Sequence, residues 1–235
     1  MPAIERVRQL KGMLLDLLFP PRCVGCGREG SFLCITCYDA LPCLAAPLCE
    51  LCGLPLKGGG LCPACARESQ AVDRIRSPLL YQGLAREVVH SLKYRNLRSL
   101  AAPLGQLLAE YLVQQALPGD VLVPVPLHPS RLRQRGYNQA TLLARELGER
   151  SGLPVVDDCL VRLTNAPAQA RSSSATERQR NVKDAFACRD NTLRGRQVLL
   201  IDDVCTTGAT LNECALALKA KGAAVVSGLT LAREV

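Results

Sequence analysis

The sequence predicts an α/β protein with a parallel sheet covered by helices on both faces, preceded by a small cysteine-rich module. Nine of the 13 cysteines lie between Cys23 and Cys65, and the remainder of the 235 residues alternates between strand-like and helical hydrophobic patterns. We therefore divide the chain into residues 1–22, an N-terminal amphipathic helix; residues 23–70, the cysteine-rich module; and residues 71–235, the α/β domain.

The first segment carries apolar residues at a helical period: Ile4, Val7, Leu10, Leu14, Leu17 and Leu18. Asp16 interrupts the segment and no signal-peptidase-like site follows it. No apolar run of the chain approaches the roughly 20 residues that a transmembrane helix needs. We expect a cytoplasmic protein without a transmembrane segment. The apolar residues 14–19 either pack on the protein's own domain or form a docking surface for a partner.

Eight cysteines of the module form four CxxC pairs: Cys23 and Cys26, Cys34 and Cys37, Cys49 and Cys52, Cys62 and Cys65. Two thiolates separated by two residues can bind one tetrahedral Zn²⁺, and two such pairs complete a site. The pattern predicts two structural zinc sites, a double zinc ribbon. Pairing in sequential order is preferred over an interleaved one, and Cys43 is left as a spare.

Disulfides and a redox CxxC motif are the alternatives to zinc. The fourfold repetition of the pattern and the lack of an export signal favour zinc. Gly58, Gly59 and Gly60 precede the last pair, so we expect the second site to be the more mobile one and its metal the less costly to lose.

The α/β domain is predicted from hydrophobic periodicity. Helical spacing occurs at residues 84–92, 100–117, 139–150 and 211–221, and continuous apolar runs typical of buried strands occur at 121–126, 198–201 and 224–229. A helix between the last two strands indicates a βαβ unit, and hence a parallel sheet.

Two adjacent carboxylates, Asp202 and Asp203, directly follow one predicted strand. The next residues include Thr206, Thr207, Gly208 and further polar groups at the start of a helix, whose N–H groups favour an anion. Two carboxylates would repel that anion unless they face another part of the ligand, such as a sugar diol. The pattern favours a phosphorylated sugar, and an ordinary strand-to-helix turn with capping threonines is the alternative.

The segment DDVCTTGAT resembles the signature of type I phosphoribosyltransferases, which bind phosphoribosyl pyrophosphate. Together with the cysteine-rich start and the stretch VPVPLHPSRLRQRGYNQA, the chain looks like the ComF family, whose members include proteins needed for uptake of transforming DNA. The resemblance covers nearly the whole chain.

The resemblance implies a fold, a ligand and a role. It implies a type I phosphoribosyltransferase-like sheet that binds Mg²⁺ with phosphoribosyl pyrophosphate, and a role in DNA uptake or natural transformation. Ribose contacts are implied for Asp202 and Asp203, and the 5-phosphate is implied to lie against Thr206, Thr207, Gly208, Ala209 and Thr210. The pyrophosphate is implied to approach the loop that begins near Leu127.

Four basic residues follow that strand: His128, Arg131, Arg133 and Arg135. Guanidinium groups suit phosphate oxygens, so this cluster is a second candidate ligand-binding group. The alternative is a solvated helix whose arginines pair with Glu146 and Glu149. Asn138 is expected to cap the helix that follows.

The catalytic residues are not identified by the sequence, so turnover as a phosphoribosyltransferase is left open. Purine-salvage enzymes of this class place an aspartate base where this chain has Thr206, and no general base for an acceptor stands out. Lys93 and Tyr94 lie either near the site or on an amphipathic surface. The polar, serine-rich segment 164–185 is the candidate mobile lid, with a surface loop as the alternative.

Two other functions compete with a transferase. A net charge of +8 favours single-stranded DNA, although aromatic residues make up only 3% and tryptophan is absent, so binding would depend on phosphate contacts. An adaptor would instead use the N-terminal helix and the zinc ribbons to bind a DNA-uptake helicase or a related competence protein.

Overall fold

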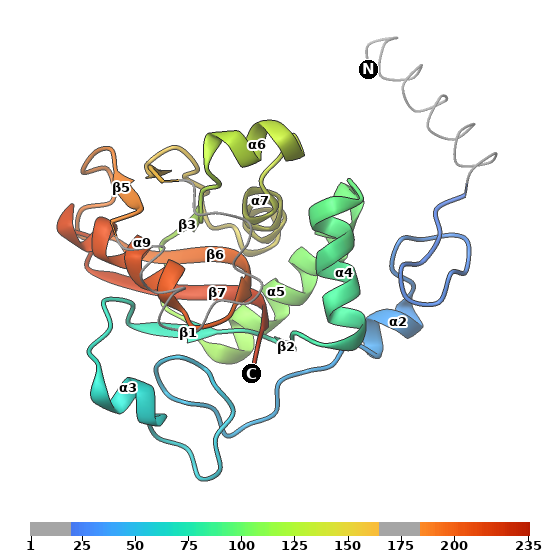
Figure 1. Ribbon diagram of the computed structural model, residues 1–235, viewed down its shortest axis with the longest axis horizontal. Coiled ribbons are helices and arrows are strands. Elements are labelled where there is room, and N and C mark those ends of the chain that lie inside the picture. The colour runs from blue at the N-terminus through green and yellow to red at the C-terminus, as the bar shows by residue number, and fades with distance from the viewer. Residues whose placement is uncertain (1–19, 165–183) are drawn as a thin grey trace.

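The computed structural model describes residues 20–164 and 184–235, and the predicted parallel sheet is confirmed (Figure 1). Its order is β1-β7-β6-β3, every neighbouring pair is parallel, and β2 continues beside β7. The strands are β1 (Arg74–Arg76), β2 (Leu79–Leu80), β3 (Val121–Pro124), β6 (Gln197–Cys205) and β7 (Val225–Arg233).

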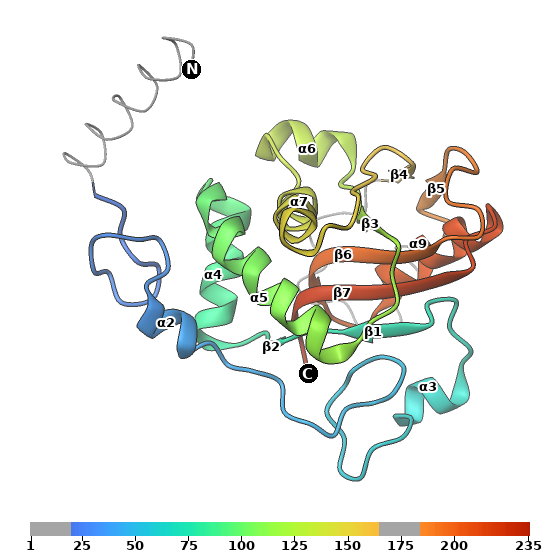
Figure 2. The same ribbon diagram turned by 180° about the vertical axis from the view of Figure 1, so that it is seen from behind.

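Helices cover both faces of this sheet, as Figures 1 and 2 show from opposite sides. One face carries α4 (Gly83–Tyr94), α5 (Ala101–Gln115) and α7 (Gln139–Ser151), which bury their apolar residues with Leu199 and Ile201 of β6. The other carries α9 (Ala209–Ala220), which packs with Val198 and Leu200. Alternate residues of β6 thus supply two separate cores, as strand geometry requires.

Short elements complete the α/β domain. The 3₁₀ helix η1 (Arg98–Leu100) precedes α5, and α6 (Pro129–Arg135) follows β3. The strands β4 (Leu160–Arg162) and β5 (Phe186–Cys188) pair antiparallel beside α9, outside the main sheet.

The cysteine-rich module lies along one side of this domain (Figure 1). Its first half contains α2 (Ile35–Asp39), and Leu33 and Leu41 bury in the same core as α4. Its second half contains α3 (Pro63–Arg67) and lies beside β1, the edge strand of the sheet.

The strand β6 is longer than the apolar run at 198–201 indicates. Pairing with β7 continues from Asp202 opposite Thr230 to Cys205 opposite Arg233. Asp202 and Asp203 therefore belong to the last part of the strand rather than to the loop after it. Backbone pairing with a neighbour, rather than side-chain hydrophobicity, extends the strand through these two polar residues.

Two predictions fall on residues that are not described. Residues 1–19, which include most of the predicted N-terminal helix, and residues 165–183, most of the candidate lid, lie outside the described part of the chain. Within the described part, no helix is both long and apolar enough to span a bilayer.

Candidate functional site

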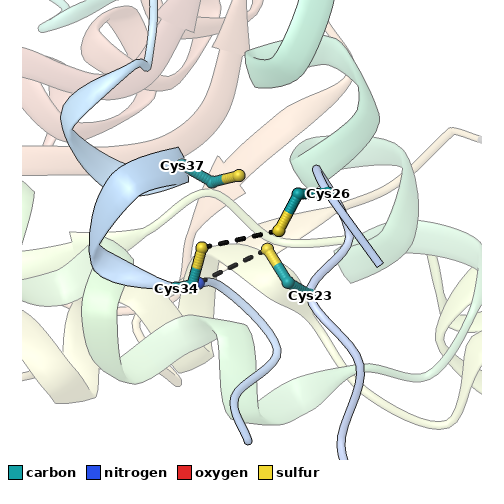
Figure 3. Close-up of side chains that lie close together, drawn as sticks. All are labelled: Cys23, Cys26, Cys34 and Cys37. Atoms are coloured by element: carbon teal, nitrogen blue, oxygen red, sulfur yellow. Dashed lines mark hydrogen bonds between the residues drawn. The ribbon is translucent and has the colours of Figure 1, made fainter. Parts of the chain in front are cut away.

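The eight cysteines of the CxxC pairs gather in two groups of four, in sequential order. Within each group all four Sγ atoms lie within 4.8 Å of one another. The first group is Cys23, Cys26, Cys34 and Cys37, drawn in Figure 3, and the second is Cys49, Cys52, Cys62 and Cys65. Cys43 belongs to neither group; its Sγ donates to Leu41 O at 3.6 Å.

The spacing of the sulfur atoms fits a tetrahedral metal. Four thiolates about 2.3 Å from Zn²⁺ lie roughly 3.8 Å apart. The Sγ atoms of Cys26 and Cys34 are 3.7 Å apart, and those of Cys52 and Cys62 are also 3.7 Å apart. The two groups therefore support structural zinc binding.

Backbone N–H groups also favour thiolates at both sites. Cys34 N–H points at Cys23 Sγ at 3.4 Å, and Cys62 N–H points at Cys49 Sγ at 3.3 Å. Burial raises the pKa of the Cys49 thiol, but donors led by Cys62 N–H more than offset it and lower that pKa to about 6. A thiol that ionises this easily is a ready metal ligand.

The second cluster is the more buried one. Cys49, Cys52 and Cys62 are all buried, whereas Cys26 of the first cluster is exposed. Arg76 of β1 donates to Cys49 O at 3.2 Å and to Glu50 O at 3.0 Å. These contacts tie the second cluster to the sheet and oppose the greater mobility that the nearby glycines predicted.

The acid pair, Asp202 and Asp203, lies at the carboxyl end of β6, where ligands bind in open parallel sheets. Asp203 is buried and Asp202 is partly buried. Burial and the neighbouring Asp203 carboxylate raise the pKa of Asp202 to about 7, and Lys93 offsets only part of this rise.

Two helices each carry a residue that contacts the Asp203 carboxylate. Lys93 Nζ of α4 lies 2.6 Å from Asp203 Oδ1, and Gln139 Nε2 of α7 donates to Asp203 Oδ2 at 3.2 Å. Burial lowers the pKa of Lys93, but the Asp203 carboxylate more than offsets it, so the net pKa is raised and the lysine is charged. Of the two positions that the sequence left open for Lys93, the structure shows the one near the site.

The segment 206–210 joins the acid pair to α9. Gly208 has φ +85°, which favours glycine, and a Cβ there would lie 3.1 Å from Ile75 Cδ1, so the Ile75 side chain would have to shift slightly. Among the described residues, the N–H groups of Thr206, Thr207 and Gly208 donate to no acceptor. Free N–H groups at the start of a helix can hold a phosphate. Ala209 and Thr210 form the first turn of that helix.

The basic residues after β3 lie on α6 rather than in a loop. His128 caps α6 by accepting the Ser130 N–H at Nδ1, and Arg131 and Arg133 are on the helix itself. Arg135 places its guanidinium 5.1 Å from the centre of the Tyr94 ring. Glu146 pairs with Arg150, so within the described residues it does not neutralise this group.

Asn138 caps α7, as its position predicts. Its side chain accepts the Ala140 N–H and donates to Val125 O, which ties the start of α7 to the end of β3. The next residue, Gln139, is thereby placed against Asp203.

For three side chains, the sequence gives no clear indication that they belong to the site region. Arg162 of β4 is electrostatically coupled to Asp202, Ile75 of β1 lies beneath Gly208, and Arg233 of β7 donates to Cys205 Sγ at 2.9 Å. Each is far along the chain from its partner. Only the tertiary fold brings these residues together.

Comparisons with known proteins agree with this architecture. Residues 14–66 match the family model described as a double zinc ribbon domain, and residues 132–234 match the phosphoribosyl transferase domain. Competence protein ComFC of Bacillus subtilis (strain 168) is 31% identical over 214 residues, which cover 86% of this chain and 84% of the relative. The chain belongs to the ComF/YhgH family.

Other ComF/YhgH relatives match over similar lengths. The DNA utilization protein YhgH of Salmonella typhimurium is 33% identical and covers 86% of this chain and 90% of its own. Competence protein F of Haemophilus influenzae is 31% identical and covers 86% and 97%. Among solved structures, adenine phosphoribosyltransferase from Leishmania tarentolae aligns with a TM-score of 0.37 at 16% identity, over 61% of this chain and 74% of that one. The family assignment rests on the sequence matches.

Proposed function

We propose that this ComF/YhgH protein binds phosphoribosyl pyrophosphate with Mg²⁺ at the carboxyl end of β6, and that it acts in DNA uptake or utilization. The role is taken from the relatives named as competence and DNA utilization proteins. The ligand is supported by one observation above all. The last part of a parallel strand carries two carboxylates, and the strand leads into a loop at the start of α9 whose N–H groups have no acceptor among the described residues.

The two halves of this site suit the two halves of the ligand. The loop N–H groups at 206–208 and the positive end of α9 suit a 5-phosphate. Carboxylates accept hydrogen bonds from sugar hydroxyls, and Mg²⁺ prefers oxygen ligands of this kind. Mg²⁺ would supply charge neutralisation for the pyrophosphate, and the Asp202 carboxylate would hold it.

The described residues support binding of phosphoribosyl pyrophosphate more directly than its transfer to an acceptor. In a transfer, an acceptor nucleophile would form a bond to the anomeric carbon while pyrophosphate leaves with the electron pair of the broken C–O bond, and positive charge would develop on the sugar ring. The partly buried Asp202 could stabilise that charge electrostatically. No described side chain is placed as a base for an acceptor, so binding is the first property to test.

The experiment is calorimetric titration of Mg²⁺ and phosphoribosyl pyrophosphate into zinc-loaded protein. We expect saturable heat in the wild type and at least about tenfold weaker binding in Asp202→Asn, because one charged acceptor is lost. Asp157→Asn is the matched control, since Asp157 lies on the surface and pairs with Arg145. Equal binding by all three proteins, or none by the wild type, would refute the site.

Single-stranded DNA is the second candidate ligand, and one observation favours it. Tyr94 is 62% exposed, with the guanidinium of Arg135 above its ring, and Arg133 is exposed on the same helix as Arg135. An exposed ring beside arginines is the arrangement that stacks a base and holds its phosphate. If phosphoribosyl pyrophosphate gives no heat, binding of an oligonucleotide that weakens steeply with salt would support this candidate instead.

A further inference from the structure

The two carboxylates of the acid pair face opposite sides of the sheet. The side chains of Leu199 and Ile201 are buried among α4, α5 and α7. Asp203 is the next residue of β6 whose side chain points to this face, and there it contacts Lys93 and Gln139. The side chain of Asp202 points to the opposite face of the sheet, and the positive charge of Arg162 of β4 partly offsets the rise in its pKa. The two carboxylates are therefore not equivalent acceptors for the two hydroxyls of one sugar diol.

Both oxygens of Asp203 already have partners within the protein. Its Oδ1 lies 2.6 Å from Lys93 Nζ, its Oδ2 accepts from Gln139, and its side chain is only 10% exposed. Asp202 differs, because its Oδ1 accepts the Asp203 N–H at 2.8 Å while no donor among the described residues is bonded to its Oδ2. Asp202 is the carboxylate with an oxygen left for a ligand.

The partners of Asp203 keep unused hydrogen-bonding groups. Lys93 bonds one carboxylate and its ammonium retains other N–H donors, while 21% of its side chain is exposed. Gln139 is buried, and its Oε1 accepts from no donor among the described residues. A buried acceptor without a donor is unfavourable, and this one is closed to solvent, so Gln139 contacts Asp203 rather than a ligand.

The position of Lys93 is set by the structure around it. The Tyr137 hydroxyl, from the turn between α6 and α7, donates to Leu92 O in the last turn of α4. Arg98 stacks on the Tyr137 ring at 4.5 Å. Leu92, the residue before Lys93, is thus bonded to the turn that leads into Gln139 at the start of α7. Lys93 and Gln139, the two partners of Asp203, are therefore held close to each other.

We propose that Lys93 is a ligand-binding residue of this site, which donates to a phosphate oxygen of the bound phosphorylated sugar while Asp203 holds its ammonium in place. In this assignment Asp202 accepts from the ligand's hydroxyls, and Asp203 and Gln139 are positioning residues. The inference rests on the proposed function, since it requires a phosphorylated sugar in the site.

Charge gives the physical reason for the arrangement. Two ionised carboxylates beside a phosphate would repel it, and a lysine that pairs with one of them cancels half of that charge. A lysine with further free donors can also bond the phosphate directly, because an ammonium is a compact point charge with three donors. The same contact therefore removes a repulsion and adds an attraction.

The test measures the effect of Lys93→Met in a protein that already carries Asp203→Asn, so that no carboxylate at position 203 is left without a positive partner. In Asp203→Asn the lysine stays charged, and we expect binding of Mg²⁺ and phosphoribosyl pyrophosphate within a few-fold of wild type. Adding Lys93→Met removes the ammonium without leaving an unpaired buried carboxylate, and we expect affinity to fall at least about tenfold further. Thermal unfolding, measured in parallel, should be similar for the two variants.

A second ion pair provides the control. Lys219 Nζ lies 2.7 Å from Asp73 Oδ1, away from the acid pair, so Lys219→Met on an Asp73→Asn background should leave affinity unchanged. Equal affinities of Asp203→Asn with and without Lys93→Met would show that Lys93 only neutralises Asp203, and would overturn the inference. Absence of binding in the wild type would refute the proposed function itself, which separates the two failures.

Discussion

At the scale of single residues, the pKa of Asp202 lies far above that of an ordinary aspartate. Burial, followed by the charge of Asp203, raises its pKa to about 7 in the folded protein, against about 3.9 for an unfolded aspartate. Between these two values the native state binds more protons than the unfolded state. This group therefore makes the protein less stable as pH rises from about 4 to about 7, and the loss persists above that range.

Replacement of Asp202 by asparagine should remove this pH dependence. Because the side chain is partly exposed, we expect Asp202→Asn to be more stable than wild type by about 1–2 kcal/mol at pH 8, with the difference vanishing toward pH 4. Urea denaturation at a series of pH values measures it.

Asp190 supplies a control of opposite sign. Hydrogen bonds from the Thr192 side chain and N–H lower its pKa, so Asp190→Asn should lose stability above about pH 4 rather than gain it. The same trend in both variants, or no trend in Asp202→Asn, would contradict the environment described for Asp202.

At the scale of elements, the two zinc knuckles differ in what their glycines contact. Gly27 follows Cys26 and Gly53 follows Cys52, with φ of +74° and +70°. A Cβ at Gly27 would meet no atom within 4 Å, whereas a Cβ at Gly53 would lie 2.7 Å from Ile75 O. The first knuckle glycine serves only the turn, and the second also allows close contact with β1.

Alanine at these two positions should separate the two requirements. Gly27→Ala carries only the strain of a positive φ, which we expect to cost about 1 kcal/mol. Gly53→Ala must also displace β1 from the knuckle, and we expect a total loss of about 2–3 kcal/mol. Chemical denaturation of zinc-loaded protein compares them, and equal losses would mean that the second knuckle is not held against β1.

At the scale of the whole molecule, the second zinc cluster is connected to the candidate phosphate loop. Ile75 N–H donates to Leu51 O at 2.6 Å within the second knuckle, and the Ile75 side chain lies under Gly208. The first cluster instead packs in the core that contains α4. The two cysteine clusters therefore contact different parts of the α/β domain.

Removal of one ligand from each cluster should show this difference. Cys37→Ser and Cys65→Ser change the last cysteine of the first and the second cluster. We expect both to lower Tm, by roughly 10 °C for a loss of about 3 kcal/mol. Only Cys65→Ser should increase hydrogen exchange of residues 206–210. Equal exchange of this loop in both variants would contradict the connection, as would no change in either.

Much of the site follows from patterns that are local in sequence. The sulfur groups of the zinc clusters come from cysteines a few residues apart, and the segment 206–210 follows the acid pair after only Val204 and Cys205, so spacing alone predicts both. The end of β6 was less predictable, because backbone pairing with β7 carries the strand through two polar residues. The helical position of Arg131, Arg133 and Arg135 was predicted only as the alternative, since a short helix has little periodicity to detect.

The sequence by itself determined the family, the two metal clusters and the order of strand, acid pair and loop, because each depends on neighbours in the chain. Only the tertiary structure decided that Lys93 and Gln139 pair with Asp203, that Asp202 and Asp203 face opposite sides, and that the second cluster supports the loop through β1. These contacts join residues far apart in the chain. Their geometry depends on strand order and helix packing, which residue spacing does not encode.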